Sequence, residues 1–312
     1  MAKSVLSEDR FHNEEAAFEY VESQLWPNGP ICPHCGADGE KIGRLEGVRS
    51  KPSKKHPQGV VQVGLRKCYA CRQPFTVRKG TIFEDSHLPL RLWLQAIHLL
   101  CASKKGISTR QLQRILGCGM KTAWHLGHRI RHAMAPASDA GPLGGSGVTV
   151  EADESEIAPS RKTKRREGHR RSDNPVVFAL VESGGKQRSM IVDHRGVRPL
   201  IHKHLHKESR LVTDMAQHYK LSGTASHESV DHSKEYVRDD VHTNTLEGFF
   251  SIFKRGLIGT YQHIDTKHFD RYLAEFDFRQ NTREKLGVDD VRRTALAVQS
   301  AKGKRLTYET TA

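Results

Sequence analysis

Residues 148–153 read VTVEAD, and this stretch does most to decide the fold. Its β-branched residues predict a strand that ends at the carboxylate of Asp153. Two further apolar stretches, 176–181 and 187–192, flank Ser183-Gly184-Gly185-Lys186 and predict two strands joined by a tight hairpin. Together these stretches indicate a sheet that begins with the Asp153 strand.

Farther along the chain, a second strand and then a helix each carry an acidic residue. A helical stretch at 197–206 leads to 211–214 (LVTD), a second short strand that ends at Asp214, and a β-like stretch follows at 227–230. Asn244 begins a helix whose apolar stripe is Leu246, Phe249, Phe250 and Phe253, with Glu247 and Lys254 two turns apart on one face.

The order of these elements places Asp153, Asp214 and Glu247 at the ends of neighbouring strands and a helix. Oxygen ligands suit Mg²⁺ (or Mn²⁺), and two such ions about 4 Å apart support in-line phosphoryl transfer. A single Asp at a strand end is more often a turn residue or a helix cap. The prediction of a magnesium site therefore depends on the ordered set, with the basic stretch 161–171 (RKTKRREGHRR) read as a loop beside it.

Charge points to a polyanionic partner. Lys and Arg outnumber Asp and Glu by 50 to 36, which gives a net charge of +14. Counterion release makes nucleic acid a favourable partner for such a chain, although a basic chain can also be merely soluble. Charge alone does not choose between DNA and RNA.

Two Cys-x-x-Cys pairs precede this region, at Cys32/Cys35 and Cys68/Cys71. One pair could be redox-active, but two pairs favour a tetrahedral Zn²⁺ site with all four positions filled, which is structural. The 32 intervening residues contain a β-like stretch at 59–65 and are tolerated as a longer hairpin. Cys101 and Cys118 lie in apolar helical surroundings and are expected to be core residues.

Between the cysteines and the sheet, residues 88–134 are expected to be helical. The first helix has Leu92, Ala96 and Leu99 on one face, and the second has Leu112, Ile115 and Leu116 inside. Gly117-Cys118-Gly119 separates the second helix from a third, which starts at Met120. This pattern fits a helix-turn-helix that presents DNA-binding candidates on its last helix, although a plain helical bundle is the alternative; the candidates are Lys121, Thr122, His125 and Arg129.

These features divide the chain into five segments. We expect an N-terminal helix plus zinc ribbon (1–87), a helix-turn-helix-like region (88–134), a Pro/Gly/Ser-rich linker (135–147), an α/β domain (148–285) and a tail (286–312). No run of about 18 apolar residues occurs, and the N-terminus lacks a signal-peptide core, so we expect a cytoplasmic protein without a membrane span.

The chain resembles the DDE-type transposases of bacterial insertion sequences, in the group with an N-terminal zinc ribbon before an RNase H-like domain. The most specific match is 242–251 (HTNTLEGFFS) with Lys254-Arg255-Gly256. Other matching stretches are 26–36 (WPNGPICPHCG), 68–71 with Phe75 and Thr81, 150–154 (VEADE), 212–214 (VTD), 231–236 (DHSKEY) and 272–281 (YLAEFDFRQN). The resemblance spans about residues 14 to 283.

The resemblance implies an enzyme that cuts its own element's terminal repeats and joins them to target DNA. Asp153 and Asp214 match the first two metal-binding acids. Glu247 followed by Lys254 fits the Glu-x6-Lys signature as the third acid, whereas some relatives use an Asn in this region, which makes Asn244 the alternative. Lys254 and Arg255 are expected to contact DNA phosphate, a solvated helix charge being the alternative for Lys254. Joining two ends implies at least a homodimer on DNA.

Three further expectations complete the prediction. The helix at 272–281 should pack on the sheet with Tyr272, Phe276 and Phe278, and His232 and His242 stay unassigned. One rival is a zinc-ribbon DNA-binding regulator with an inactive C-terminal domain. The other is an RNase H-like nuclease that cuts without joining.

Overall fold

The computed structural model describes residues 3–54, 56–137, 139–157, 174–193, 196–214, 226–230 and 244–307. The chain forms two compact units. Unit 1 comprises Met1–Ser103, Thr109–Met134 and Asp290–Ala312, and unit 2 comprises Lys104–Ser108 and Ala135–Asp289. The predicted basic loop at 161–171, as well as His232 and His242, lies outside the described residues.

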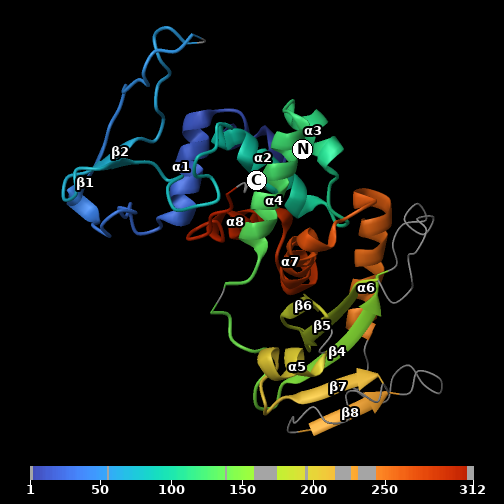
Figure 1. The fold of residues 1–312 in the computed structure, drawn as a ribbon. Coiled ribbons are helices and arrows are strands. Elements are labelled where there is room, and N and C mark those ends of the chain that lie inside the picture. Colours follow the sequence, from blue (N-terminus) through green and yellow to red (C-terminus); the bar gives the residue numbers. More distant parts are fainter. Residues whose placement is uncertain are drawn as a thin grey trace. The chain divides into compact units, whose positions relative to one another are not determined.

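Unit 2 is built on a five-stranded mixed sheet with the strand order β6-β5-β4-β7-β8 (Figure 1). Strands β4, β5 and β6 pair antiparallel, whereas β7 and β8 run parallel to β4. The strands are β4 (Thr149–Glu156), β5 (Val176–Glu182), β6 (Gln187–Ile191), β7 (Arg210–Asp214) and β8 (Ser226–Val230).

Strand β4 corrects one prediction, because it does not end at Asp153 but continues to Glu156. Its parallel pairing with β7 stops at Ala152↔Thr213, while its antiparallel pairing with β5 continues through Asp153↔Ala179 to the end of the strand. The long β5 supplies partners beyond the point where β7 ends. Asp153 therefore lies at the end of the β4–β7 ladder, inside a longer strand.

Helices cover both faces of this sheet. One face packs on α6 (Asn244–Gly256) and α7 (Phe269–Asn281), and the other packs on α5 (Arg198–His204). The predicted stripe of α6 is buried in the first core, and Tyr272 and Phe276 of α7 are buried as expected, with Phe278 half-buried. The predicted fold class, a mixed sheet flanked by helices after a cysteine-rich ribbon and a helical region, is confirmed.

The predicted linker at 135–147 is in part packed onto unit 2: Leu143 is buried in the α5 core, and its backbone bonds to the backbone of His204 and His206.

Short 3₁₀ segments lie at Val5–Ser7, Asp9–Phe11, Gly39–Lys41, Thr266–His268 and Glu284–Leu286, and a π-helical turn at Leu257–Tyr261 follows α6.

Side chains of helix α7 hydrogen-bond the open backbone groups of the edge strand β6, where another strand could otherwise pair. The carboxylate of Asp277 accepts hydrogen bonds from the Ser189 backbone N–H (2.7 Å), the Ser189 Oγ (2.6 Å) and the Gln187 Nε2 (2.8 Å). Asn281 accepts from the Gln187 backbone N–H and donates to its carbonyl. Edge strands otherwise present open backbone groups, so α7 both covers and terminates this sheet.

We therefore expect Asp277→Ala to destabilise unit 2 by about 3 kcal/mol, because it leaves buried donors without an acceptor. The free energy of unfolding in urea measures this change. Glu208→Ala, at an exposed position of the same unit, is the matched control and should stay within about 0.5 kcal/mol of wild type. A loss below about 1 kcal/mol for Asp277→Ala would show that water replaces these bonds.

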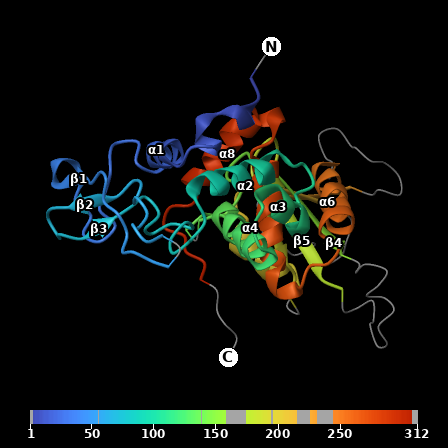
Figure 2. The same ribbon diagram turned by 90° about the horizontal axis from the view of Figure 1, so that it is seen from above.

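Unit 1 combines a helical bundle with a three-stranded antiparallel ribbon (Figure 2). The ribbon strands are β1 (Ile42–Arg44), β2 (Arg66–Cys68) and β3 (Pro74–Phe75). The helices are α1 (Glu14–Leu25), α2 (Leu90–Ala102), α3 (Thr109–Leu116), α4 (Met120–Met134) and α8 (Asp290–Gln299).

Helix α8 corrects the prediction of a C-terminal tail from 286. It packs against α2, with Ala297 and Val298 buried and the His98 Nδ1 3.0 Å from the Thr294 Oγ1. Its buried surface is small and Arg-flanked, so the apolar pattern in the sequence is weak. Two predicted helix faces are also shifted: Leu92 and Leu99 are only half-buried while Trp93, Ile97 and Leu100 form the buried face, and Ile115 is exposed.

Candidate active site and metal centre

Alternation along β4 places Glu151 and Asp153 on the face of the sheet that α6 covers, because Val150 and Ala152 pack into the opposite core. Glu151 is only 4% exposed, and its Oε1 accepts a hydrogen bond of 2.8 Å from the Thr245 Oγ1 in the first turn of α6. This bond ties the start of α6 to the strand that carries Asp153.

Three carboxylates share this end of unit 2. Asp153 lies where the β4–β7 ladder ends, Asp214 is the last residue of β7, and Glu247 is exposed in the first turn of α6. The pKa of Asp153 is raised to about 6, mainly by burial; a 2.8 Å hydrogen bond from the Glu154 backbone N–H lowers it, and the nearby Asp214, Glu154 and Glu247 carboxylates add smaller increases. The three predicted acids therefore lie in one electrostatic neighbourhood.

These carboxylates are spaced more widely than the ligands of a single ion. Within the described ranges, only the four cysteines bring three or more potential ligand atoms to within 4.8 Å of one another. Ligands of an ion pair about 4 Å apart spread over a larger space, and a hard divalent cation prefers oxygen donors. The described acids thus do not form a single-ion cluster of the kind that the four cysteines form. Asn244 begins α6, and its side chain lies outside the described part of the structure.

The shifted pKa of Asp153 makes stability depend on pH. The ordinary pKa of the group is 3.8 and its folded value is about 6, so the folded state holds the proton more tightly and stability falls as pH rises between these values. Asp153→Asn removes this titration. Without added Mg²⁺, we expect its Tm advantage over wild type to grow from pH 4 to pH 7 and to reach a few degrees, at about 2–4 °C per kcal/mol.

Melting curves at several pH values, with and without Mg²⁺, test this expectation. Mg²⁺ should raise the Tm of wild type at pH 7 but leave that of Asp153→Asn nearly unchanged. Equal Mg²⁺ responses in the two proteins would argue against Asp153 as a ligand.

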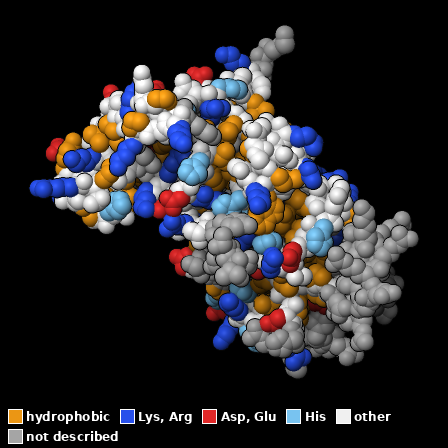
Figure 3. Space-filling view, turned by 45° about the horizontal axis from the view of Figure 1, so that its top comes forward, with side chains coloured by type: hydrophobic (Ala, Val, Ile, Leu, Met, Phe, Trp, Pro, Cys, Tyr) orange, Lys and Arg blue, Asp and Glu red, His pale blue; other side chains and the backbone are white. Residues whose placement is uncertain are grey.

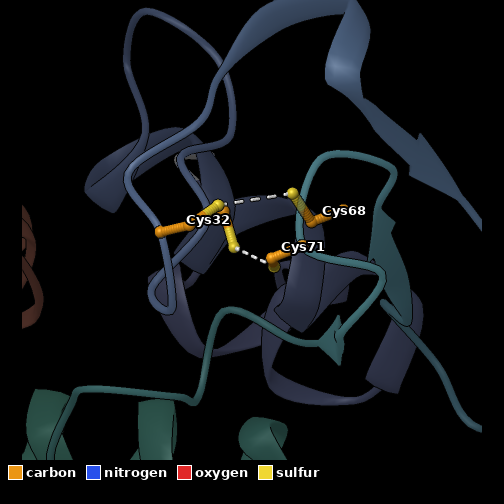
Figure 4. A group of neighbouring side chains, drawn as sticks. Cys32, Cys68 and Cys71 are labelled. Carbon is orange, nitrogen blue, oxygen red and sulfur yellow. Dashed lines mark hydrogen bonds between the residues drawn. The ribbon is translucent and has the colours of Figure 1, made fainter.

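The four predicted zinc ligands form the second candidate centre. The sulfurs of Cys32 and Cys71 are 3.7 Å apart, as are those of Cys35 and Cys68. Figure 4 shows the labelled side chains converging on one point. Thiolates bound to one tetrahedral zinc at about 2.3 Å lie about 3.8 Å apart, so the spacing fits. A hydrogen bond from the Cys71 backbone N–H lowers the pKa of Cys68 to about 7, which favours the ligating thiolate.

Comparison with known proteins supports the zinc centre and identifies the domain family of unit 2. Residues 142–281 match the model of the ISXO2-like transposase domain, and residues 12–74 match that of the transposase zinc-ribbon domain. Residues 142–281 thus belong to the ISXO2-like transposase domain family, and a transposase zinc ribbon precedes them. It is also 27% identical over 302 residues to an uncharacterized protein in the transposable element ISH50 of Halobacterium salinarum, covering 89% of this chain and 95% of the relative.

The matched zinc-ribbon segment ends before the helical bundle of this transposase. There α3 and α4 are joined across 117–119, and Gly117 adopts a φ of +63°, which glycine tolerates in such a turn. Lys121 and Thr122 are exposed, His125 is half-buried, and the three line a pocket of about 490 Å³ with the 85–88 segment. The two helices thus have the expected connection.

Arg129 occupies a different environment from the one expected of a DNA-binding residue. It is only 6% exposed, its guanidinium donates to the Glu84 carbonyl, and it lies 5.2 Å from the centre of the Trp93 ring. Desolvation on burial lowers the pKa of Arg129. These contacts show that Arg129 packs within unit 1, and it is therefore not among the residues that we propose below to contact DNA.

On α6 of the transposase, Lys254 is half-buried and Arg255 is exposed, with its Nη2 2.6 Å from the Ser251 Oγ. They lie on the same helix as Glu247. The sequence analysis assigned no role to Glu151 or Thr245. Only the alternation of β4 relative to Asp153 could have indicated that Glu151 faces the same side. No helix in the described part of the chain is long and apolar enough to span a bilayer.

Proposed function

We propose that this chain is a DNA transposase that cleaves the ends of its insertion sequence and joins them to target DNA by metal-dependent phosphoryl transfer. The observation that carries the proposal is the electrostatic coupling of Asp153 to Asp214 and Glu247 in a domain of the ISXO2-like family. A carboxylate whose pKa is raised by burial and by neighbouring acids is stabilised in its charged form when a divalent cation binds.

In this proposal Asp153, Asp214 and Glu247 hold Mg²⁺ or Mn²⁺. When bound, a pair of such ions supplies activation of the attacking oxygen and stabilisation of the leaving oxygen. The chain contributes the Asp153 carboxylate, which is mostly ionised at neutral pH because its raised pKa is about 6. The Thr245–Glu151 bond keeps the first turn of α6, and with it Glu247, in register with β4.

The remaining predicted residues have supporting roles in this proposal. Cys32, Cys35, Cys68 and Cys71 hold a structural Zn²⁺ in the ribbon. Lys254 and Arg255 contact phosphates beside the acids, and Lys121 and Thr122 at the exposed start of α4 contact the terminal repeats. Joining two ends requires at least two copies of the chain on DNA.

The identity of the third ligand is tested by comparing Glu247→Gln with Asn244→Ala. We expect Glu247→Gln to lower cleavage by at least about 100-fold, because a carboxylate binds Mg²⁺ more strongly than an amide. Asn244→Ala should cost less than about tenfold. The reverse order would transfer the ligand role to Asn244.

The assay uses a labelled terminal-repeat duplex with Mg²⁺ and resolves cleaved from joined products. Transposase activity requires both products, and both must depend on the acids. Cleavage without joining would favour an RNase H-like nuclease, and DNA binding without cleavage would favour a zinc-ribbon regulator.

A further inference from the structure

A paired arm, residues 45–65, extends the ribbon beyond its three-residue strands β1 and β2 (Figure 1). Its two sides are joined by backbone hydrogen bonds from the Leu45 N–H to the Leu65 carbonyl (2.9 Å), from the Gln62 N–H to the Val48 carbonyl (2.8 Å) and from the Ser50 N–H to the Val60 carbonyl (2.8 Å). Apart from Lys55, which lies outside the described residues, residues 45–65 thus form the two hydrogen-bonded sides of one arm.

Gly59 fixes the outer part of this arm. Its φ is +68°, and a Cβ at this position would lie 2.1 Å from the Ser50 carbonyl oxygen. The Arg49 Nη1 also reaches across the arm to the Gly59 carbonyl at 3.3 Å. A side chain at 59 would therefore separate the two sides.

The arm is strongly basic. Residues 45–65 contain Arg49, Lys51, Lys54 and Lys55 against a single acid, Glu46, which lies at the base of the arm 3.8 Å from Arg44. Lys51 and Lys54 are exposed, and neither forms an ion pair with a carboxylate of the described residues. At the base of the arm, by contrast, Arg66 pairs with Glu22 at 2.5 Å. Figure 3 shows Lys and Arg side chains spread over the ribbon, at the left of the view.

Apolar side chains accompany these charges. Val48, Val60 and Val61 are 38%, 48% and 41% exposed, respectively. A two-stranded ribbon with neither face covered is marginally stable alone, so a binding partner would complete it. The partner must carry negative charge and offer small apolar groups. Duplex DNA provides both through its phosphates, its sugars and its thymine methyl groups.

We propose that the arm of residues 45–65 binds duplex DNA as a two-stranded ribbon, with Lys51 and Lys54 neutralising backbone phosphates. A ribbon of this kind fits the major groove, which is about 12 Å wide. The arm adds a contact surface to those of α4 and α6. This second proposal rests on the proposed function only because it takes DNA as the partner; it does not require that the chain cleaves DNA.

The test measures Kd for a terminal-repeat duplex at several salt concentrations, using the full chain without added Mg²⁺ and without chelator, so that bound zinc is kept. For Lys51→Gln/Lys54→Gln, we expect the slope of log K against log salt to fall by about 0.9 per lost phosphate contact, about 1.8 in total. Kd should rise at least about tenfold at 0.1 M salt. Lys186→Gln/Lys285→Gln, at exposed positions of unit 2, makes the same change in net charge and should leave the slope unchanged.

Equal losses in the two double variants would overturn the proposal, since bulk charge would then explain them. So would an unchanged slope in Lys51→Gln/Lys54→Gln. Gly59→Ala tests the ribbon geometry at constant charge: it should also weaken binding while zinc content stays at the wild-type value. Full affinity in Gly59→Ala would overturn the paired-ribbon geometry. Strand cleavage by wild type is assayed separately, so failure of the proposed enzyme and failure of the arm give different results.

Discussion

Replacing Asp153 with alanine is expected to lower Mg²⁺-dependent cleavage and joining by at least about 10³-fold, a barrier increase of about 4 kcal/mol. The reason is its position. Asp153 is half-buried at the end of the β4–β7 ladder, and the Asp214 and Glu247 carboxylates raise its pKa. Its removal takes away one of the three proposed metal-binding carboxylates.

The measurement is single-turnover cleavage of the terminal-repeat duplex, with Kd determined in parallel without Mg²⁺. DNA affinity should stay within about twofold of wild type, because the proposed DNA contacts lie on other elements. Glu154→Ala is the matched control. Glu154 neighbours Asp153, but alternation turns it to the opposite face of β4, where it pairs with Phe178 of the α5 core. Its loss should cost less than about tenfold.

Asp214→Ala should produce a loss of the same size, and the double variant should be little worse than either single one, because residues that act as a unit are not additive. If Asp153→Ala cuts as fast as wild type, the active site is elsewhere and the DNA-binding regulator becomes the better reading of the chain.

Strand and helix patterns in the sequence were sufficient to predict that Asp153, Asp214 and Glu247 lie near one another, while their role as metal ligands stays a prediction. Each acid is next to a strongly periodic apolar stretch, and such stretches have one preferred way to bury their side chains. The order strand, hairpin, helix, strand, helix then restricts how the sheet can be formed. The sequence did not show that β4 continues past Asp153, because this depends on the length of its partner β5.

Other features depend on tertiary contacts that leave no periodic signal. A buried acid such as Glu151 looks like a surface acid in the sequence until its partner Thr245 is known. Arg129 belongs to a basic helix end and was expected at DNA, yet it packs over Trp93. Helix α8 buries a small surface against α2, which is distant in sequence. In all three cases the deciding partner is remote along the chain.

Replacing Cys68 with serine is expected to abolish zinc binding and unfold the ribbon. The only fully buried side chains of its small cluster are Cys32, Cys68 and Phe75, with Trp26 and Ile42 partly buried beside them. So small an apolar core cannot offset the conformational entropy of the ribbon, whereas structural zinc sites contribute about 10–16 kcal/mol of apparent binding free energy. Metal must therefore supply most of the stability of this part of unit 1.

Zinc content of the purified chain, together with limited proteolysis between the cysteine pairs, measures this effect. Wild type should hold about one zinc per chain and resist cleavage at the ribbon strands β1 and β2, whereas Cys68→Ser should lose the metal and be cut there. Cys118→Ser, which alters a half-buried cysteine outside the cluster, should match wild type. Because the arm begins and ends on strands that the cluster supports, Cys68→Ser should also lower the salt slope of DNA binding at least as much as Lys51→Gln/Lys54→Gln. If Cys68→Ser lacks zinc but still resists proteolysis at β1 and β2 and binds DNA with full affinity, the ribbon folds without metal.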